Sequence, residues 1–429
     1  MALLFLWLFL GMLVFSVPMF YLMLAAPGIA LWLEGKTVFL NLLMQRLYSG
    51  IDSFPLMALP FFILAGEMMT HGGVTRRMAD FANSFVGHLR GGLAHVSVCS
   101  SVMLAGGCGS AVADASALGS LLIPAMQEQG YSKRYSSAVI AASAVIVSII
   151  PPSGLFILYA FIMNESIAAM FAGGIIPGLL IAAALMATIA IRAPGQNLPV
   201  SGEKPSVKEI VRTFKRAFLP LLTPVLLIGG IVGGVFTPTE AAAVAAFYSM
   251  ILGLFYTKEI KFSDLGKIFS KTALSSAIIL MLVGAAVAFA SVISLKGTPQ
   301  MVTEMVLGIT DNVYLMFFIV NLLLLGVGCL VDAGPAILML APILAPMMIK
   351  MGIHPVHFGL VMSINLIIGL ITPPMGLVLF VVSGISREKV EVIAKEMLPL
   401  FLAEVGVLFF ITYVPETCLF IPRLMGYVQ

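Results

Sequence analysis

Two aspartates lie inside apolar stretches of this chain, and each sits in the same surrounding pattern. Asp114 follows a glycine-rich stretch that begins at Gly106, and Pro124 comes ten residues after this aspartate. Asp332 follows a second glycine-containing stretch, and Pro342 again comes ten residues after it. A carboxylate inside a membrane span is costly, and by default it is a candidate functional residue. The pattern indicates a binding site built from two related halves.

A Pro-Pro pair completes the pattern in each half. Pro151-Pro152 begins 21 residues after Gly130, and Pro373-Pro374 begins 21 residues after Gly352. Proline removes a backbone donor and interrupts a helix, so each pair predicts a broken helix. Broken helices in corresponding positions of two halves are typical of the binding site of a secondary transporter.

The glycines indicate what such a site could bind. Glycine lets the backbone bend sharply and approach a ligand, which frees carbonyl groups for a hard cation such as Na⁺. The N-termini of the half-helices favour anions. Three hydroxyl side chains add further oxygen atoms: Ser110, Ser153 and Thr372. Neither aspartate has a histidine or a second acid nearby in the sequence, so we expect no hydrolytic enzyme.

Structural roles for the same residues remain open at this point. The glycines could serve only to let helices pack closely. Each aspartate could cap a half-helix by accepting backbone N–H groups. Asp114 is followed by the helix-like ASALGSLL, and Asp332 could cap a helix that starts at Pro335.

Other polar residues in apolar runs are expected to form hydrogen bonds between helices: Glu67, Glu240, His95, Asn321 and Asn365. Asn365 is the best candidate ligand among them, because it lies two turns before the second Pro-Pro pair. The segment Thr237-Pro238-Thr239-Glu240 predicts a helix start with Thr239 as the N-cap.

Composition places the whole pattern in a membrane. The chain has 429 residues, of which 60% are hydrophobic and 10% are charged. Its mean hydropathy is +1.10, whereas a soluble protein has about 25% charged residues. A span needs roughly 20 apolar residues, so about ten to twelve spans or half-spans fit. The fold class we predict is an all-α integral membrane protein.

Several function classes are excluded by what the sequence lacks. It has no GxxxxGK[ST] loop, so we do not expect it to hydrolyse ATP. The net charge of +3 is not gathered into a basic run among aromatic residues, which argues against a nucleic-acid partner. The four cysteines have no metal-ligand spacing and are expected to pack. Sodium or a partner must therefore supply the driving force.

The elements that position the site can be outlined from hydropathy and turn residues. An amphipathic interfacial helix is expected at 31–48. Spans are expected at 3–24, 54–70, 166–191, 217–236, 239–256, 273–295, 313–330 and 398–415. Hairpins are expected at 92–128 and 326–350, and broken helices at 135–163 and 355–383. Basic residues crowd the loops at 192–216 and 257–271, which places both loops in the cytoplasm.

Four segments together resemble a known family. GGCGSAVADASALGSLLIPAMQEQGY, SIIPPSGLFILYA, GGVFTPTEAAAVAAFY and GLITPPMG are similar to the large membrane subunit of tripartite ATP-independent periplasmic (TRAP) transporters. The resemblance covers essentially the whole chain. It implies Na⁺-driven uptake of an organic acid across the bacterial inner membrane, with a soluble periplasmic binding protein and a small four-helix membrane subunit. It also implies two inverted repeats and an elevator mechanism.

The sequence is most similar to the sialic acid branch of this family. C4-dicarboxylates, other sugar acids and a stand-alone organic-anion carrier of similar architecture remain alternatives. An intramembrane enzyme or a channel would need a catalytic pair or a continuous polar pore, and the sequence has neither.

The resemblance also implies site residues, with two or more sodium ions. One sodium site would use Gly106, Gly107, Ser110, Ser148 and Pro151. The other would use Gly328, Asp332, Gly369, Thr372 and Met375. The substrate would lie near Ser110, Ser153 and Asp332.

The resemblance further implies a division into scaffold and transport parts. Residues 1–72 would hold scaffold helices and an interfacial arm, and 73–193 the first transport repeat. Residues 194–216 would form a cytoplasmic linker, and 217–271 further scaffold helices and an arm. The second transport repeat would cover 272–383, and a C-terminal helix would lie within 384–429.

Overall fold

The computed structural model describes residues 4–15, 17–107, 109–196, 198–200, 206–308, 310 and 312–428. The regular elements of this part of the chain are all helices, which confirms the predicted all-α class. Up to Arg192 they are α1 (Leu4–Val14), α2 (Met19–Leu33), α3 (Val38–Ile51), η1 (Phe54–Met57), α4 (Ala58–His71), α5 (Val74–Val86), α6 (Gly92–Leu104), α7 (Ala111–Glu128), α8 (Lys133–Ile149), α9 (Gly154–Met163) and α10 (Ile167–Arg192).

The helices after Arg192 are α11 (Val207–Val232), α12 (Pro238–Ile251), η2 (Leu252–Tyr256), α13 (Phe262–Leu295), α14 (Thr298–Leu307), α15 (Val313–Gly328), α16 (Ala333–Lys350), α17 (Pro355–Gly369), α18 (Leu377–Ser386), α19 (Val390–Tyr413) and α20 (Glu416–Leu424). In the described residues, six helices are long and apolar enough to cross a membrane, or up to eight if each bent pair is one span. This agrees with a multi-pass membrane protein.

Both halves contain a hairpin followed by a broken helix. The first helix–loop–helix is α6–α7, over the predicted residues 92–128, and α8–α9 is bent by 42° at the first Pro-Pro pair. The second consists of α15 and α16, followed by α17 and α18 on either side of Pro373-Pro374. Its first helix begins at Val313, so the predicted range 326–350 was too short. A uniformly apolar run gave no sign that α15, with 16 residues, is shorter than a span of roughly 20.

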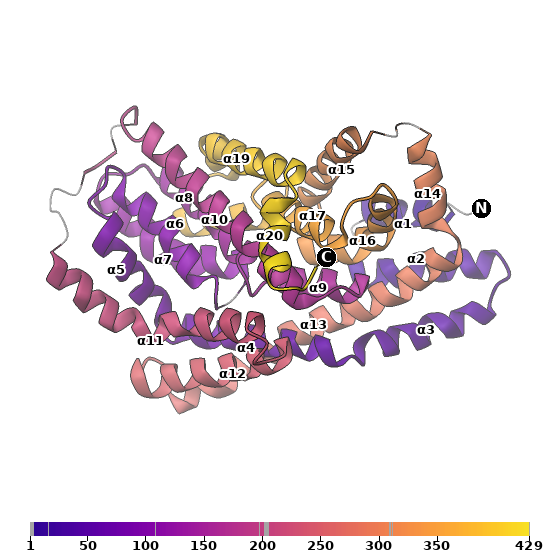
Figure 1. Ribbon diagram of the computed structural model, residues 1–429, viewed down its shortest axis with the longest axis horizontal. Helices are drawn as coiled ribbons and strands as arrows, with labels where there is room; N and C mark the ends of the chain where they lie inside the picture. The colour runs from indigo at the N-terminus through magenta and orange to yellow at the C-terminus, as the bar shows by residue number, and fades with distance from the viewer. Residues whose placement is uncertain are drawn as a thin grey trace.

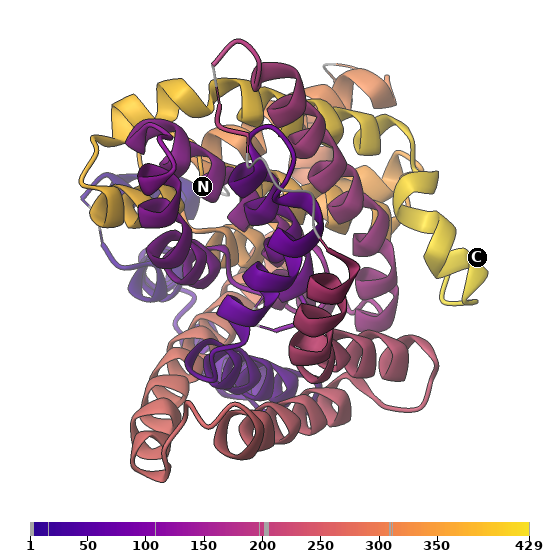
Figure 2. The same ribbon diagram turned by 90° about the vertical axis from the view of Figure 1, so that its left-hand side faces the viewer.

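The two halves pack on each other in a reciprocal way. The second hairpin helix of the first half, α7, packs on α18, and its counterpart α16 packs on α9. Outside this core, α3 packs along α13, and α12 packs along α4. In both views the helices α11, α12 and α13 lie along one side of the molecule, below the hairpins and broken helices (Figures 1 and 2). This arrangement supports two related halves, while their inversion and the scaffold–transport division stay predictions.

Three predicted boundaries were wrong for local reasons. The expected span 3–24 is divided into α1 and α2, because Pro18 is the N-cap of α2 and cannot continue a helix from α1. Residues 207–216 of the expected linker are the first turns of α11, where Arg212 pairs with Glu209 at 2.8 Å. The last long helix, α19, begins at Val390, and α20 follows it.

The turn before α12 corrects the predicted helix cap. Thr237 is the N-cap, because its hydroxyl accepts the Glu240 amide at 3.3 Å and Glu240 accepts the Thr237 amide at 2.8 Å. Thr239 was therefore the wrong choice. Pro238 occupies the first helical position, where a missing N–H costs nothing.

Polar residues inside the apolar helices hold neighbouring helices together. The Asn365 amide of α17 donates to the Asn321 side chain of α15 at 2.8 Å, and Asn321 donates to Thr412 of α19 at 3.0 Å. In the first half, the hydroxyls of Ser97 and Ser143 meet at 2.6 Å between α6 and α8. The Asn365 amide nitrogen is thus engaged between helices, as expected for this group, while its candidacy as a ligand stays a prediction.

We predict that Asn321→Ala lowers the thermal stability of the purified protein in detergent. The change leaves the buried Asn365 amide without its side-chain acceptor, and hydrogen bonds between membrane helices contribute about 1–2 kcal/mol. Asn41→Ala, at an exposed position on α3, is the control and should leave the melting temperature unchanged. Equal melting curves for Asn321→Ala and the wild type would contradict the structural role of this network.

Candidate functional site

A cavity of about 310 Å³ lies where both hairpin tips meet both breaks. From the first half, Ser110, Ser148 and Pro152 line it, and from the second half Asp332 and Leu370 do so. Residues distant in the sequence are therefore brought to one place. This is the arrangement that the duplicated pattern predicted.

Four helix N-termini reach this cavity. The first residues of α7, α9, α16 and α18 all line it, namely Ala111, Gly154, Ala333 and Leu377. A helix N-terminus presents unpaired N–H groups and about half a positive charge. Among the described lining residues, Asp332 is the only charged side chain. The positive potential in the cavity therefore comes from backbone groups, which suit a carboxylate or another anion.

The opposite wall of the cavity is apolar. It consists of Leu59, Phe62 and Ile63 on α4 together with Ile278, Ile279 and Leu282 on α13. Sequence reasoning missed all six residues, because apolar side chains in a membrane helix carry no signal that distinguishes a cavity wall from a packing surface. A ligand here would have a polar side against the hairpin tips and an apolar side against α4 and α13.

Ser148 joins the first hairpin tip to its broken helix. Its hydroxyl donates to the Gly109 carbonyl at 3.0 Å and accepts the Ala111 amide at 2.8 Å. Gly109 has a φ of +55°, and a Cβ built on it would lie 2.6 Å from the Pro152 carbonyl oxygen. Only glycine fits this close approach without strain. Ser110 then caps α7 by accepting the Ala113 amide at 3.3 Å.

The remaining first-half candidates occupy different surroundings. Ser153 is the N-cap of α9, and its fully buried hydroxyl has no hydrogen-bond partner among the described residues. Ser153 and Pro151 do not belong to the cavity lining. An unpaired buried hydroxyl within a break is free to bind an ion or a water molecule.

Gly106 and Gly107 contact the helices outside the hairpin. A Cβ on Gly106 would strike Pro224 of α11, and one on Gly107 would lie 2.6 Å from the Met69 sulfur of α4. This supports the close-packing interpretation of these two glycines. Coordination of sodium by either of them stays a prediction.

The second hairpin tip is joined to its broken helix by backbone contacts. The Met375 amide donates to the Cys329 carbonyl at 3.2 Å, so the second break is attached to the tip. A Cβ on Gly369 would lie 2.6 Å from the Gly328 carbonyl carbon, so α15 and α17 meet at two glycines. Thr372 donates to the Ile368 carbonyl at 3.1 Å.

The two aspartates have different roles. Asp332 is exposed toward the cavity and is the N-cap of α16, where it accepts the Ala333 amide at 2.8 Å. Its helix begins at Ala333, two residues before the predicted start. Asp114 is buried in the first turn of α7 and accepts the Ser101 hydroxyl at 2.8 Å. The capping role considered for Asp114 was wrong, because Ser110 occupies the cap position.

The donor chemistry is that of a hard cation. No group of three or more His, Cys, Asp or Glu side chains that could hold a metal ion occurs in the described part of the chain. A cation in either break would be held mainly by hydroxyl and carbonyl oxygens, which fits Na⁺ better than a transition metal. Cys108, for which packing was expected, lies outside the described residues.

Comparison with known proteins decides the family. The model of the family "Tripartite ATP-independent periplasmic transporter, DctM component" matches residues 5–417. The chain belongs to this family. It is therefore the large permease component of a TRAP-type secondary transporter for organic acids, an integral multi-pass protein of the inner membrane.

Three relatives illustrate the range of this TRAP family. The chain is 38% identical to a sialic acid TRAP transporter large permease of Vibrio cholerae, covering 91% of each chain. It is 36% identical to the 2,3-diketo-L-gulonate large permease of Escherichia coli, covering 97% of each chain. It is also 36% identical to the C4-dicarboxylate large permease of Rhodobacter capsulatus, covering 89% of this chain and 90% of that one.

The fold is shared with a more distant transporter of known structure. The YdaH transporter of Alcanivorax borkumensis superimposes with a TM-score of 0.62 at 16% identity, covering 87% of this chain and 88% of that one. At this identity the likeness concerns the fold alone.

We predict that Gly369→Ala destabilises the second hairpin of this TRAP permease. The added methyl group meets the Gly328 backbone, and overpacking of this kind costs about 1–3 kcal/mol. Gly384→Ala is the matched control, because nothing lies within 4 Å of a Cβ on this α18 glycine. Thermal unfolding of both variants in detergent should show a lower midpoint for Gly369→Ala only, and a wild-type midpoint would refute the close contact.

Proposed function

We propose that this protein carries out Na⁺-coupled uptake of an organic acid, and that the cavity between the hairpin tips is its substrate site. The observation that supports this most strongly is the convergence of four helix N-termini on one cavity. These termini can bind a carboxylate, while Asp332 accepts hydrogen bonds from the polar part of the substrate and the Ser110 hydroxyl donates one to it. The apolar wall on α4 and α13 excludes water from the other side.

We favour a sugar acid of the sialic acid type as the substrate. The names of the relatives include sialic acid, 2,3-diketo-L-gulonate and C4-dicarboxylate carriers, and all three substrates are organic anions. A cavity of about 310 Å³ with several polar groups accommodates a polyhydroxylated acid of this size. C4-dicarboxylates remain the alternative.

Two sodium sites would exist, one between each hairpin tip and the broken helix of the same half. In the first half the candidate ligands are Gly106, Gly107, Ser110, Ser148 and Pro151. In the second half they are Gly328, Asp332, Gly369, Thr372 and Met375. Binding of a cation at these places would strengthen the attachment of tip to break and so assemble the substrate site.

Translocation would occur by an elevator movement. The hairpins and broken helices would slide as one body against α4, α11 and α13, with the small residues Gly106 and Gly107 at the sliding surface. The inverted repeats of the family supply the two alternative positions. Substrate would arrive from a periplasmic binding protein, and a small four-helix subunit would enlarge the scaffold.

The direct test is uptake of labelled sialic acid into proteoliposomes that hold this chain and its small subunit. An inward Na⁺ gradient would be applied with and without the binding protein. We expect uptake only when both are present. Uptake without the binding protein would favour the stand-alone carrier, and uptake of a dicarboxylate in place of sialic acid would contradict the favoured substrate.

We predict that Asp332→Ala reduces this uptake about ten-fold or more, which is the effect of losing one charge-assisted hydrogen bond. The variant should still reach the membrane, since in the described part of the chain the Asp332 side chain accepts one backbone amide and no other hydrogen bond. Asp52→Ala, at an exposed position after α3, is the matched control. Wild-type uptake by Asp332→Ala would exclude the residue from the site.

The elevator movement predicts that a bond across the sliding surface stops transport. In a background with serine at every native cysteine, Gly107→Cys with Met69→Cys should form a disulfide, because these positions are in contact. Before oxidation this variant should still transport, since residue 107 would hold sodium through its backbone carbonyl, which the substitution keeps. Uptake should be lost on oxidation and return on reduction. The control is Ser97→Cys with Ser143→Cys, whose hydroxyls lie 2.6 Å apart inside the moving body. Full uptake by the oxidised Gly107–Met69 pair would rule out sliding at this surface.

A further inference from the structure

A second cavity, lined by charged side chains, lies where the start of α5, the middle of α11 and the end of η2 meet. Its volume is about 490 Å³. Three arginines, two carboxylates and a tyrosine line it: Arg76, Arg77, Arg216, Asp80, Glu259 and Tyr256. We call it the arginine pocket.

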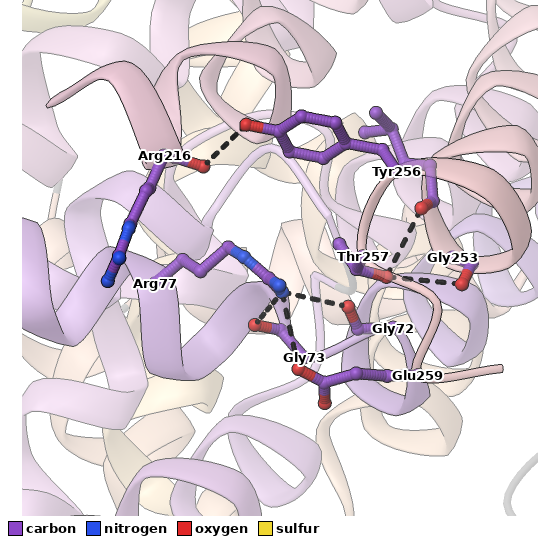
Figure 3. A network of polar contacts seen from close by, with 9 residues as sticks. Gly72, Gly73, Arg77, Arg216, Gly253, Tyr256, Thr257 and Glu259 are labelled. Carbon is purple, nitrogen blue, oxygen red and sulfur yellow. Dashed lines mark hydrogen bonds and ion pairs between the residues drawn. The ribbon is translucent and has the colours of Figure 1, made fainter. Parts of the chain in front are cut away.

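One of the three arginines makes contacts within the protein, through one nitrogen of its guanidinium group. Arg77 donates to the Gly73 carbonyl at 3.1 Å and pairs with Glu259 at 3.4 Å (Figure 3). Gly73 has a φ of +68°, and a Cβ there would strike the Glu259 carboxylate. Arg77 and Glu259 therefore neutralise each other and secure the joint between α4 and α5.

The other two arginines are available to a ligand. The guanidinium groups of Arg76 and Arg216 have no hydrogen bond or ion pair within the described residues, and both side chains are exposed. In Figure 3 the tip of the Arg216 side chain ends without a contact, while its backbone carbonyl accepts the Tyr256 hydroxyl. Asp80 is the one carboxylate of the pocket that is not paired with Arg77. The pocket thus keeps an excess of positive charge.

Three helices change from apolar to polar at this pocket. The span containing α4 ends at His71, and the span formed by α12 and η2 ends at Tyr256. In α11 the polar run VKEIVRTFKR gives way to apolar sequence directly after Arg216. The pocket therefore lies at the level where the hydrocarbon core of the membrane meets the lipid headgroups.

Aromatic side chains beside the pocket fit this depth. The rings of Phe214 and Phe218 on α11 meet edge to face with centroids 5.6 Å apart, and both are exposed. Phe255 of η2 is 62% exposed. The Tyr256 hydroxyl donates to the Lys215 carbonyl at 3.3 Å, which fixes its ring at the same level. Tyrosine is typical of the membrane interface, and exposed phenylalanines suit its apolar side. Here they offer a surface for the upper part of acyl chains.

The basic residues around the pocket indicate which leaflet of the membrane it faces. Arg212, Lys215, Lys258 and Lys261 flank the pocket in the sequence, and the positive-inside rule places them in the cytoplasm. Basic pockets between membrane helices on the cytoplasmic side bind anionic lipid headgroups. A guanidinium group can also donate to two oxygens of one phosphate in a fixed geometry, whereas the ammonium group of lysine acts as a point charge.

We propose that the arginine pocket binds the phosphate diester of an anionic phospholipid of the cytoplasmic leaflet, through Arg76 on α5 and Arg216 on α11. The bound headgroup connects two helices that otherwise meet through side-chain packing and a Ser84–Thr213 hydrogen bond of 3.1 Å. It does so next to the joint between α4 and α5. The acyl chains lie along the exposed aromatic residues of α11 and η2.

The test is native mass spectrometry of the full chain, titrated with phosphatidylglycerol or phosphatidylcholine. The wild type should bind phosphatidylglycerol more tightly. Arg76→Gln with Arg216→Gln should weaken that binding about ten- to thirty-fold, because each basic side chain near an anionic surface contributes roughly five-fold. It should weaken phosphatidylcholine binding less, because the choline cation already offsets the phosphate charge that the two arginines attract. Arg212→Gln is the control, since Arg212 pairs with Glu209 outside the pocket. It should bind as the wild type does.

Two further measurements test whether the lost binding reflects the arginines and whether the ligand is a lipid. Arg76→Lys with Arg216→Lys keeps the positive charge and should retain more of the lipid preference than the glutamine pair. Retained preference in the lysine pair would show that substitution at these two positions does not disrupt the fold. Inorganic phosphate at millimolar concentration should not displace phosphatidylglycerol. A glutamine pair that still prefers phosphatidylglycerol would overturn the proposal. So would displacement of the lipid by inorganic phosphate, which would indicate a site for a soluble anion.

Discussion

Backbone groups left unpaired at membrane depth are the constraint on which the rest of this structure depends. Two hairpin tips and two Pro-Pro breaks interrupt helices in a region where water cannot satisfy their N–H and carbonyl groups. Each tip therefore pairs with the break of its own half, through Ser148 in one half and the Met375–Cys329 backbone contact in the other. The same interruptions create the four helix N-termini that face the cavity. Stability and ligand binding thus arise from the same feature.

The reciprocal packing of the halves follows from this constraint. A tip attached to a break has no covering on its other side, and the second hairpin helix supplies it by packing on the broken helix of the opposite half. On one side α4 and α13 contact this core, through α9 and α16 respectively, and α12 and α3 pack on them from outside. An arrangement of this kind separates a part with many interrupted helices from a part with continuous ones. That separation is the physical basis of the elevator proposal.

The sequence predicted the features that depend on local backbone chemistry. Pro151-Pro152 and Pro373-Pro374 break their helices wherever they are placed, and Gly109 permits a conformation that other residues disfavour. The sequence could not distinguish Asp114 from Asp332, because burial depends on the neighbours that folding brings close. It also gave no indication of the α4 and α13 wall, or of the correct start of the second hairpin. Apolar residues look alike in a sequence whether they face lipid, another helix or a ligand.

The most direct test of the central claim is to measure the reactivity of a cysteine placed in the cavity. Gly334 lines the cavity, and a Cβ there makes only ordinary contacts, the nearest at 3.7 Å. Gly334→Cys, in a background without native cysteines, would be labelled with a maleimide in the presence of sialic acid and either Na⁺ or K⁺. The account predicts slower labelling when sialic acid and Na⁺ are both present. An unchanged labelling rate, with other organic acids of the family giving the same result, would contradict a sodium-dependent anion site between the hairpin tips.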